Sequence, residues 1–167
     1  MAGQEKKKRL ALDTNILFDL AAGQDFAHDF IGVFIEKGYV FSVPPTVVQE
    51  LSAFAFKQSD GGKRDLAIAA LRDMRGWGIE PYDLKSVGHG ITEQFAQLLF
   101  LKKMLPEDEL NDGLILAETA LAHIPVLVTS DRHLLDIEAS ELKVIFDERD
   151  LFPVTVFHPK RLLRAIQ

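Results

Sequence analysis

Short apolar runs alternate along the chain with longer segments of helical period. The apolar runs that we expect to form strands are residues 10–12, 39–43, 79–82, 125–129, 142–146 and 155–157. Apolar residues three and four positions apart predict helices between them, each packing one face on a core. These helices cover residues 16–22, 26–37, 44–57, 66–74, 92–104, 107–123 and 159–166. Strands separated by helices of this length predict an α/β fold, a three-layer α/β/α sandwich with a central, mostly parallel sheet.

The helix at 44–57 has a recognisable start. Pro44 and Pro45 fit a first helical turn, where the missing N–H groups would have no partner in any case. Thr46 and Gln49 stand at the spacing of a capping box. We therefore expect Thr46 to cap this helix, which places Glu50 near its beginning.

Length and composition indicate one ordinary globular domain, residues 1–167. The chain has no cysteine, which excludes disulfides, thiolate nucleophiles and cysteine-bound zinc and fits a reducing cytoplasm. No apolar run approaches the roughly 18 residues of a membrane span, so we expect a soluble, cytoplasmic protein. The net charge of −6 argues against a general nucleic-acid binder. That argument fails if the acids gather at a metal site and the bases lie around it.

Four acids fall where a parallel sheet would bring them together. Asp13 directly follows the strand at 10–12, and Asp131 follows the strand at 125–129. Ligands bind outside the carboxyl ends of parallel strands, where both acids should lie. The helices between parallel strands run the opposite way and begin at that same edge. Glu50 and Asp112 lie near the beginnings of two such helices.

Four neighbouring carboxylates repel one another unless a cation lies between them. Oxygen ligands suit Mg²⁺ or Mn²⁺, and a cation of this kind with bound water suits the hydrolysis of a phosphodiester. Each acid alone also has an ordinary use. Asp13 would cap a helix and Asp131 would begin a turn, while Glu50 would be solvated and Asp112 would favour a helix N-terminus.

The same residues resemble a PIN-domain nuclease over nearly the whole chain. The segment LALDTNIL at 10–17 is similar to the opening strand and first acid of that family. The segments at 47–51, 111–117 and 126–135 resemble those that carry its second, third and fourth acids. The resemblance implies about five parallel strands, Mg²⁺ or Mn²⁺, and cleavage of single-stranded RNA by an endoribonuclease.

The resemblance also implies roles for single residues and for partners. Asp13, Glu50, Asp112 and Asp131 would bind metal and activate water, and Asn15 and Thr129 would orient these acids through hydrogen bonds. Arg132 and His133 adjoin the fourth acid, where they are candidates for contact with substrate phosphate. Many small PIN domains are toxins of toxin–antitoxin pairs and form homodimers, which suggests an antitoxin protein as a partner.

Three other functions compete with an endoribonuclease. The first is a catalytically silent PIN-like module that binds RNA or protein. The second is a phosphatase with Asp13 as its nucleophile, although such enzymes usually carry another acid where this chain has Asn15. The third is a DNA nuclease of the flap type, although no added segment is visible for gripping a branched duplex. Loss of metal-dependent cleavage in Asp13→Asn would favour the nuclease over the binding module.

Overall fold

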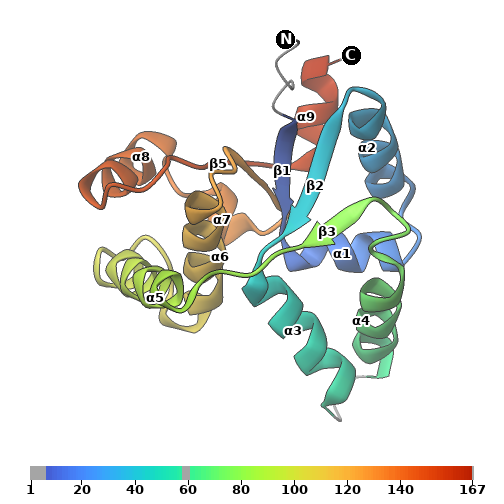
Figure 1. The fold of residues 1–167 in the computed structure, drawn as a ribbon, viewed down its shortest axis with the longest axis horizontal. Helices are drawn as coiled ribbons and strands as arrows, with labels where there is room; N and C mark the ends of the chain where they lie inside the picture. Colours follow the sequence, from blue (N-terminus) through green and yellow to red (C-terminus); the bar gives the residue numbers. More distant parts are fainter. Residues whose placement is uncertain (1–6, 58–60, 167) are drawn as a thin grey trace.

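The central layer is a sheet of five parallel strands (Figure 1). The structure is a computed structural model that describes residues 7–57 and 61–166. Its strands are β1 (Lys8–Leu12), β2 (Tyr39–Val43), β3 (Ile79–Pro81), β4 (Val126–Val128) and β5 (Thr155–Phe157). They lie in the order β3-β2-β1-β4-β5, and every neighbouring pair is parallel. The prediction of a mostly parallel sheet of about five strands is confirmed.

The strand order changes direction beside β1. From β1 the chain adds β2 and β3 on one side and then crosses over to add β4 and β5 on the other. In an open parallel sheet, such a switch point leaves a crevice outside the carboxyl ends of the two flanking strands. Here those strands are β1 and β4, which pair Leu12 with Val128 at their carboxyl ends. Residues that directly follow this pair therefore occupy the natural ligand position of the fold.

Helices flank the sheet and complete the predicted three-layer sandwich. They are α1 (Thr14–Ala21), α2 (Asp25–Glu36), α3 (Pro45–Phe56), α4 (Gly61–Asp73), α5 (Ser86–Leu101), the 3₁₀ turn η1 (Glu107–Glu109), α6 (Leu110–Leu121), α7 (Arg132–Leu135), α8 (Ala139–Glu148) and α9 (Pro159–Ile166). Helix α5 packs on α6, α3 packs on α4, and α2 packs on α9. None of the helices within residues 7–57 and 61–166 is long and apolar enough to cross a membrane.

Phenylalanine rings join the helices to the sheet and to one another. The ring of Phe30 in α2 contacts those of Phe34 and Phe41, with centroid distances of 4.7 and 5.6 Å. Phe95 of α5 stacks on Phe146 of α8 with a centroid distance of 4.8 Å. All five rings are at most 2% exposed, so they belong to the core.

Residues 142–146 lie in α8, so the prediction of a strand here is wrong. Leu142, Ile145 and Phe146 are buried, whereas Val144 is 54% exposed. Burial at the first, fourth and fifth positions of the run is the period of a helix. An apolar run of five residues is too short for its period to be identified from the sequence. The stacking of Phe146 on Phe95 selects the helix through a contact between distant segments.

Helix α3 begins at Pro45, as the two prolines predict, which is two residues earlier than a capping box at Thr46 requires. Pro44 is its N-cap and Pro45 its first residue, and no side-chain hydrogen bond comes from the N-cap. Thr46 is therefore the second residue of the helix, and its predicted role as the cap is wrong. The fixed backbone angle of Pro45 already fits the first helical position, which explains the early start. The N–H of Thr46, which has no acceptor within this first turn, donates to a side chain of another helix, as described below.

Candidate metal site

Asp13 lies where β1 ends and α1 begins. Its N–H donates to the carbonyl of Val128 at 3.0 Å, which continues the pairing of β1 with β4 by one residue. Its Oδ1 accepts a hydrogen bond from the N–H of Thr14 at 2.7 Å, so the side chain caps α1. Asp13 is only 3% exposed. The ordinary use of this aspartate as a cap is therefore real, and its second carboxylate oxygen remains available to the switch point.

Asp131 is the N-cap of α7 and follows β4 after Thr129 and Ser130. Its Oδ1 accepts from the N–H of His133 at 2.9 Å. Its own N–H donates to the hydroxyl oxygen of Thr129 at 3.0 Å. These two bonds fix both the backbone and the carboxylate of Asp131 beside the end of β4.

Asp112 reaches the same place from the first turn of α6 and is 7% exposed. The next residue, Gly113, packs directly against Ala96 of α5. A Cβ at this position would lie 3.0 Å from both Cα and Cβ of Ala96, closer than such atoms approach in proteins. Glycine is therefore required for the two helices to pack at this distance. The same packing determines how far Asp112 stands from the sheet.

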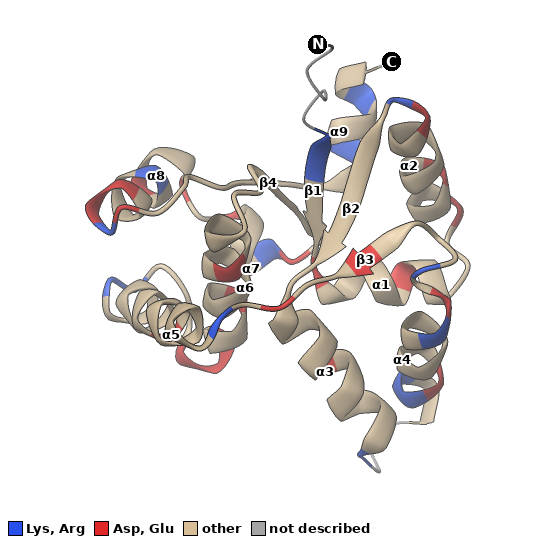
Figure 2. Cartoon of the chain, in the orientation of Figure 1, with Lys and Arg blue, Asp and Glu red and all other residues tan. Residues whose placement is uncertain are grey.

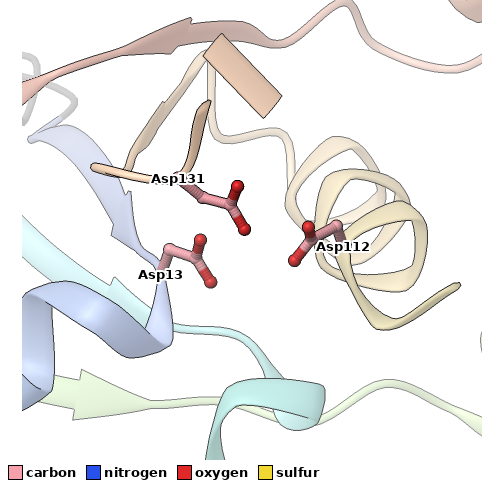
Figure 3. A group of neighbouring side chains, drawn as sticks. All are labelled: Asp13, Asp112 and Asp131. Atoms are coloured by element: carbon pink, nitrogen blue, oxygen red, sulfur yellow. The ribbon is translucent and has the colours of Figure 1, made fainter. Parts of the chain in front are cut away.

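Asp13, Asp112 and Asp131 come together at the switch point. One carboxylate oxygen from each lies within 4.8 Å of the others, and Figure 3 shows the three side chains pointing toward a common space. Among residues 7–57 and 61–166, Glu50 does not belong to this tight group. It lies in α3, near enough to Asp13 for the two charges to repel each other. The structure thus gathers three of the four predicted acids and leaves the fourth beside them.

The hydroxyl of Thr129 connects the acids through hydrogen bonds. It accepts from the side-chain amide of Asn15 at 3.2 Å and from the N–H of Asp131 at 3.0 Å. Both lone pairs are then occupied, so its single proton points to Oδ2 of Asp13 at 2.7 Å. Asn15 is oriented in turn, because its Oδ1 accepts from the N–H of Ser130 at 3.2 Å. The predicted partners Asn15 and Thr129 therefore lie in one network with two of the aspartates.

Burial raises the pKa of three acids at this site, Asp13, Glu50 and Asp112. Burial is the largest cause for Asp13, whose pKa rises to about 6, and the charge of Asp131 adds to it. Burial and then the charge of Asp13 raise the pKa of Glu50 to about 7. The pKa of Asp112 rises far above its usual range, first through burial and then through the neighbouring carboxyl of Glu109. In the absence of a cation, these groups are costly to ionise together.

We expect the metal-free protein to lose stability as the pH rises from about 4 to about 7. The native state holds the proton of Asp13 up to about pH 6, whereas the unfolded chain releases it near 3.8. The stabilisation that this proton gives is therefore complete below pH 3.8, the pKa of Asp13 in the unfolded chain. It is lost as the pH rises through about 6, the pKa of Asp13 in the folded chain. The loss from this carboxyl alone is about 3 kcal/mol. Urea unfolding in EDTA across this range measures it, and a flat or rising stability contradicts the raised pKa values.

Glu109 is a fifth acid at the site that the sequence did not single out. It is the last residue of η1, and it raises the pKa of Asp112, Asp13 and Glu50. Its Oε1 lies 3.8 Å from Nε2 of His133. The only sequence signal was the acidic run at 107–109, which also suits an ordinary helix N-terminus.

Arg132 and His133 are exposed at the start of α7. His133 faces Glu109 at the rim of the site, whereas no contact joins the guanidinium of Arg132 to the three aspartates within the described chain. Both positions adjoin Asp131 and leave their side chains accessible. Contact of either residue with substrate phosphate stays a prediction.

The donor set fits a hard divalent cation. Oδ2 of Asp112 and Oε1 of Glu50 are buried and have no hydrogen-bond partner within residues 7–57 and 61–166. A buried oxygen without a partner costs free energy, which a bound cation would recover. All candidate ligand atoms are carboxylate oxygens, the type that Mg²⁺ and Mn²⁺ prefer. The residues present therefore fit either ion.

Solved structures share this fold. The chain resembles VapBC2 from Rickettsia felis bound to a DNA fragment from their promoter, with a TM-score of 0.61 and 15% identity over 90% of this chain and 98% of that chain. It resembles FitAcB from Neisseria gonorrhoeae with a TM-score of 0.52 and 18% identity, over 90% of this chain and 97% of that chain. It also resembles FitAB bound to an IR36 DNA fragment with a TM-score of 0.51 and 19% identity, over 90% of this chain and 94% of that chain. These are toxin–antitoxin complexes whose toxin is a PIN-domain nuclease. The predicted likeness to the PIN fold is confirmed.

The sequence matches no family model and no curated protein. At identities of 15 to 19%, the structural likeness establishes the fold alone.

Proposed function

We propose that the chain is a Mg²⁺- or Mn²⁺-dependent endoribonuclease that hydrolyses phosphodiester bonds of single-stranded RNA. The observation that carries this proposal is the group of three aspartate oxygens within 4.8 Å at the switch point of the sheet. Packing these buried acids together costs stability in the folded chain. A divalent cation would offset that cost, and cation binding explains why the three acids lie together.

In this proposal Asp13, Asp112 and Asp131 hold the cation, and Glu50 completes the acidic set from α3. A divalent cation supplies an activated water and stabilises negative charge on a phosphate that is being cleaved. Thr129 donates to Asp13 and keeps that carboxylate directed at the common space. Glu50 lies beside this group in α3 and, when ionised, would take a proton from water.

The burial of the site favours a single strand as substrate. Asp13 and Asp112 are 3% and 7% exposed, so little of either side chain is accessible to a phosphate. A flexible single strand can bring a phosphate close to such buried acids more readily than a stiff duplex can. Figure 2 shows basic residues at the amino end of β1 and on α9, far from the acids at the carboxyl edge. Arg132 and His133, which adjoin Asp131, would therefore contact the substrate phosphate.

The structural neighbours also support a partner for this chain. Because VapBC2, FitAB and FitAcB are toxin–antitoxin complexes, we propose that this chain acts as a cytoplasmic toxin and binds an antitoxin protein. A homodimer of the chain belongs to the same proposal. Co-expression with the neighbouring gene product, followed by measurement of the mass of the complex, tests both assemblies.

We expect the purified chain to cleave labelled single-stranded RNA when Mn²⁺ or Mg²⁺ is present and to be inactive in EDTA. Duplex RNA and single-stranded DNA of the same sequence should be cut more slowly. The products on a sequencing gel measure the reaction, and calorimetry measures Mn²⁺ binding. A chain that binds neither metal nor RNA would overturn the proposal. RNA binding without cleavage at any metal concentration would favour a PIN-like binding module.

A further inference from the structure

We propose that Glu118, which lies outside the acidic group, is a positioning residue that fixes Glu50 by capping the helix that carries it. Glu118 lies in α6 and is 2% exposed. Its Oε1 accepts from the N–H of Thr46 at 3.0 Å, and its Oε2 accepts from the hydroxyl of Thr46 at 2.6 Å. A buried carboxylate is stable only when it is well paired, and both partners here belong to one residue of α3. The inference rests on the proposed function, because it assigns a role within the same site.

The first turn of α3 explains why this partner is needed. Pro44 and Pro45 have no N–H group, and the N–H of Val47 donates to the carbonyl of Pro44 at 3.1 Å. The N–H of Val48 also points to the carbonyl of Pro44, at 3.3 Å. The N–H of Thr46 is therefore the donor of this turn that requires an acceptor from outside the helix. Glu118 supplies that acceptor from α6 and places a negative charge where the helix dipole favours one.

This pair of bonds joins the two helices that carry Glu50 and Asp112. Glu50 follows Thr46 by four residues, so both lie on one face of α3, about 6 Å apart along the axis. On α6, Asp112 precedes Glu118 by six residues, or about 9 Å. The hydroxyl of Tyr82, just after β3, donates to the carbonyl of Glu118 at 2.9 Å and ties this point to the sheet. The bonds to Thr46 thus fix how α3 lies against α6, and with it the distance of Glu50 from Asp112.

Two substitutions at Glu118 separate its role as a cap from its charge. Glu118→Gln keeps an oxygen for the N–H of Thr46 and offers an amide to its hydroxyl, whereas Glu118→Ala removes both. We expect Glu118→Ala to weaken Mn²⁺ binding about 10-fold or more, as measured by calorimetry, and Glu118→Gln to remain within about three-fold of the wild type. Amide hydrogen exchange of residues 46–50 in EDTA should be faster in Glu118→Ala alone. Equal Mn²⁺ affinity in Glu118→Ala and the wild type would overturn the inference.

A role through Glu50 also predicts how two changes combine. In a Glu50→Gln background, Glu118→Ala should change Mn²⁺ affinity and cleavage rate by less than about two-fold, because the residue that it positions has already been altered. A full additional loss in the double variant would show that Glu118 acts by another route and would overturn the inference.

Phe34→Leu serves as a control for general loss of stability. Phe34 is 2% exposed, contacts Phe30 and Tyr39, and lies in α2, which packs on α9 and β2. It should lower the melting temperature while leaving Mn²⁺ affinity unchanged, and an equal loss of affinity would overturn the inference. A wild-type chain that binds no Mn²⁺ would instead refute the proposed function. In that case, amide hydrogen exchange of residues 46–50 in EDTA still tests whether Glu118 caps α3. Exchange in Glu118→Ala that equals the wild type would overturn this role.

Discussion

Asp13→Asn is expected to reduce metal-dependent RNA cleavage at least about 10³-fold, or about 4 kcal/mol in activation free energy. Asp13 is the most buried of the three gathered aspartates and the only one fixed by both Thr14 and Thr129. Asparagine keeps the shape and one acceptor oxygen but removes the charge that would hold a cation. Initial rates on labelled single-stranded RNA in Mn²⁺ measure the effect.

The same variant should fold normally. In EDTA near neutral pH, its melting temperature should stay close to that of the wild type, because the variant removes a carboxyl that is costly to ionise and also one of its two acceptor oxygens. Asp65→Asn is the matched control, since it removes an exposed carboxylate on α4 and should leave cleavage unchanged. A folded Asp13→Asn chain that cuts RNA at the wild-type rate would show that the activity comes from another site or a contaminant.

Thr129→Val is expected to have the second largest effect, because one hydroxyl group serves three partners. The variant leaves Oδ2 of Asp13, the amide of Asn15 and the N–H of Asp131 without their bonds. Unpartnered groups in a buried position cost about 1–3 kcal/mol each, so we expect unfolding free energy to fall by at least about 2 kcal/mol. Mn²⁺ affinity should fall about 10- to 100-fold. Urea unfolding in EDTA and calorimetry with Mn²⁺ measure the two losses.

Thr92→Val provides the control for this change of shape and polarity. Thr92 is also buried, at 1% exposed, and its hydroxyl donates to the carbonyl of His89 in its own helix. The substitution there should leave Mn²⁺ affinity unchanged and should cost less stability than Thr129→Val. Thr129→Ser, which keeps the hydroxyl, should recover most of the metal affinity. Equal Mn²⁺ binding in Thr129→Val and the wild type would remove Thr129 from the site.

The positions of Asp13 and Asp131 were predictable because each follows a short apolar run. Alternation of such runs with helices requires parallel strands, and parallel strands end at one edge. The residue that follows each strand was therefore placed by topology alone. That β1 pairs directly with β4 was not predictable in this way, and this pairing brings the two aspartates into one group.

Glu50 and Glu109 show where local sequence becomes insufficient. The place of α3 depends on Thr46 and Glu118, which are 72 residues apart, and no local pattern reveals that pair. The acids at 107–109 look alike in the sequence, and the 3₁₀ turn η1 decides that Glu109 faces Asp112. In both cases a contact between helices determines the distance of an acid from the other acids by a few ångströms. A difference of this size decides whether a group of side chains can bind a metal ion.

The pairing of β1 with β4 also has a consequence for biosynthesis. The hydroxyl of Thr129 and the carboxylate of Asp13 are 116 residues apart along the chain. At about 5–20 residues per second, a ribosome needs roughly 6–23 s to travel that distance. Throughout this interval the growing polypeptide contains Asp13 but lacks the strand that completes its surroundings. An activity that needs the assembled site cannot begin during translation of these residues, so a cell has several seconds in which a binding partner can reach the nascent chain before it can act.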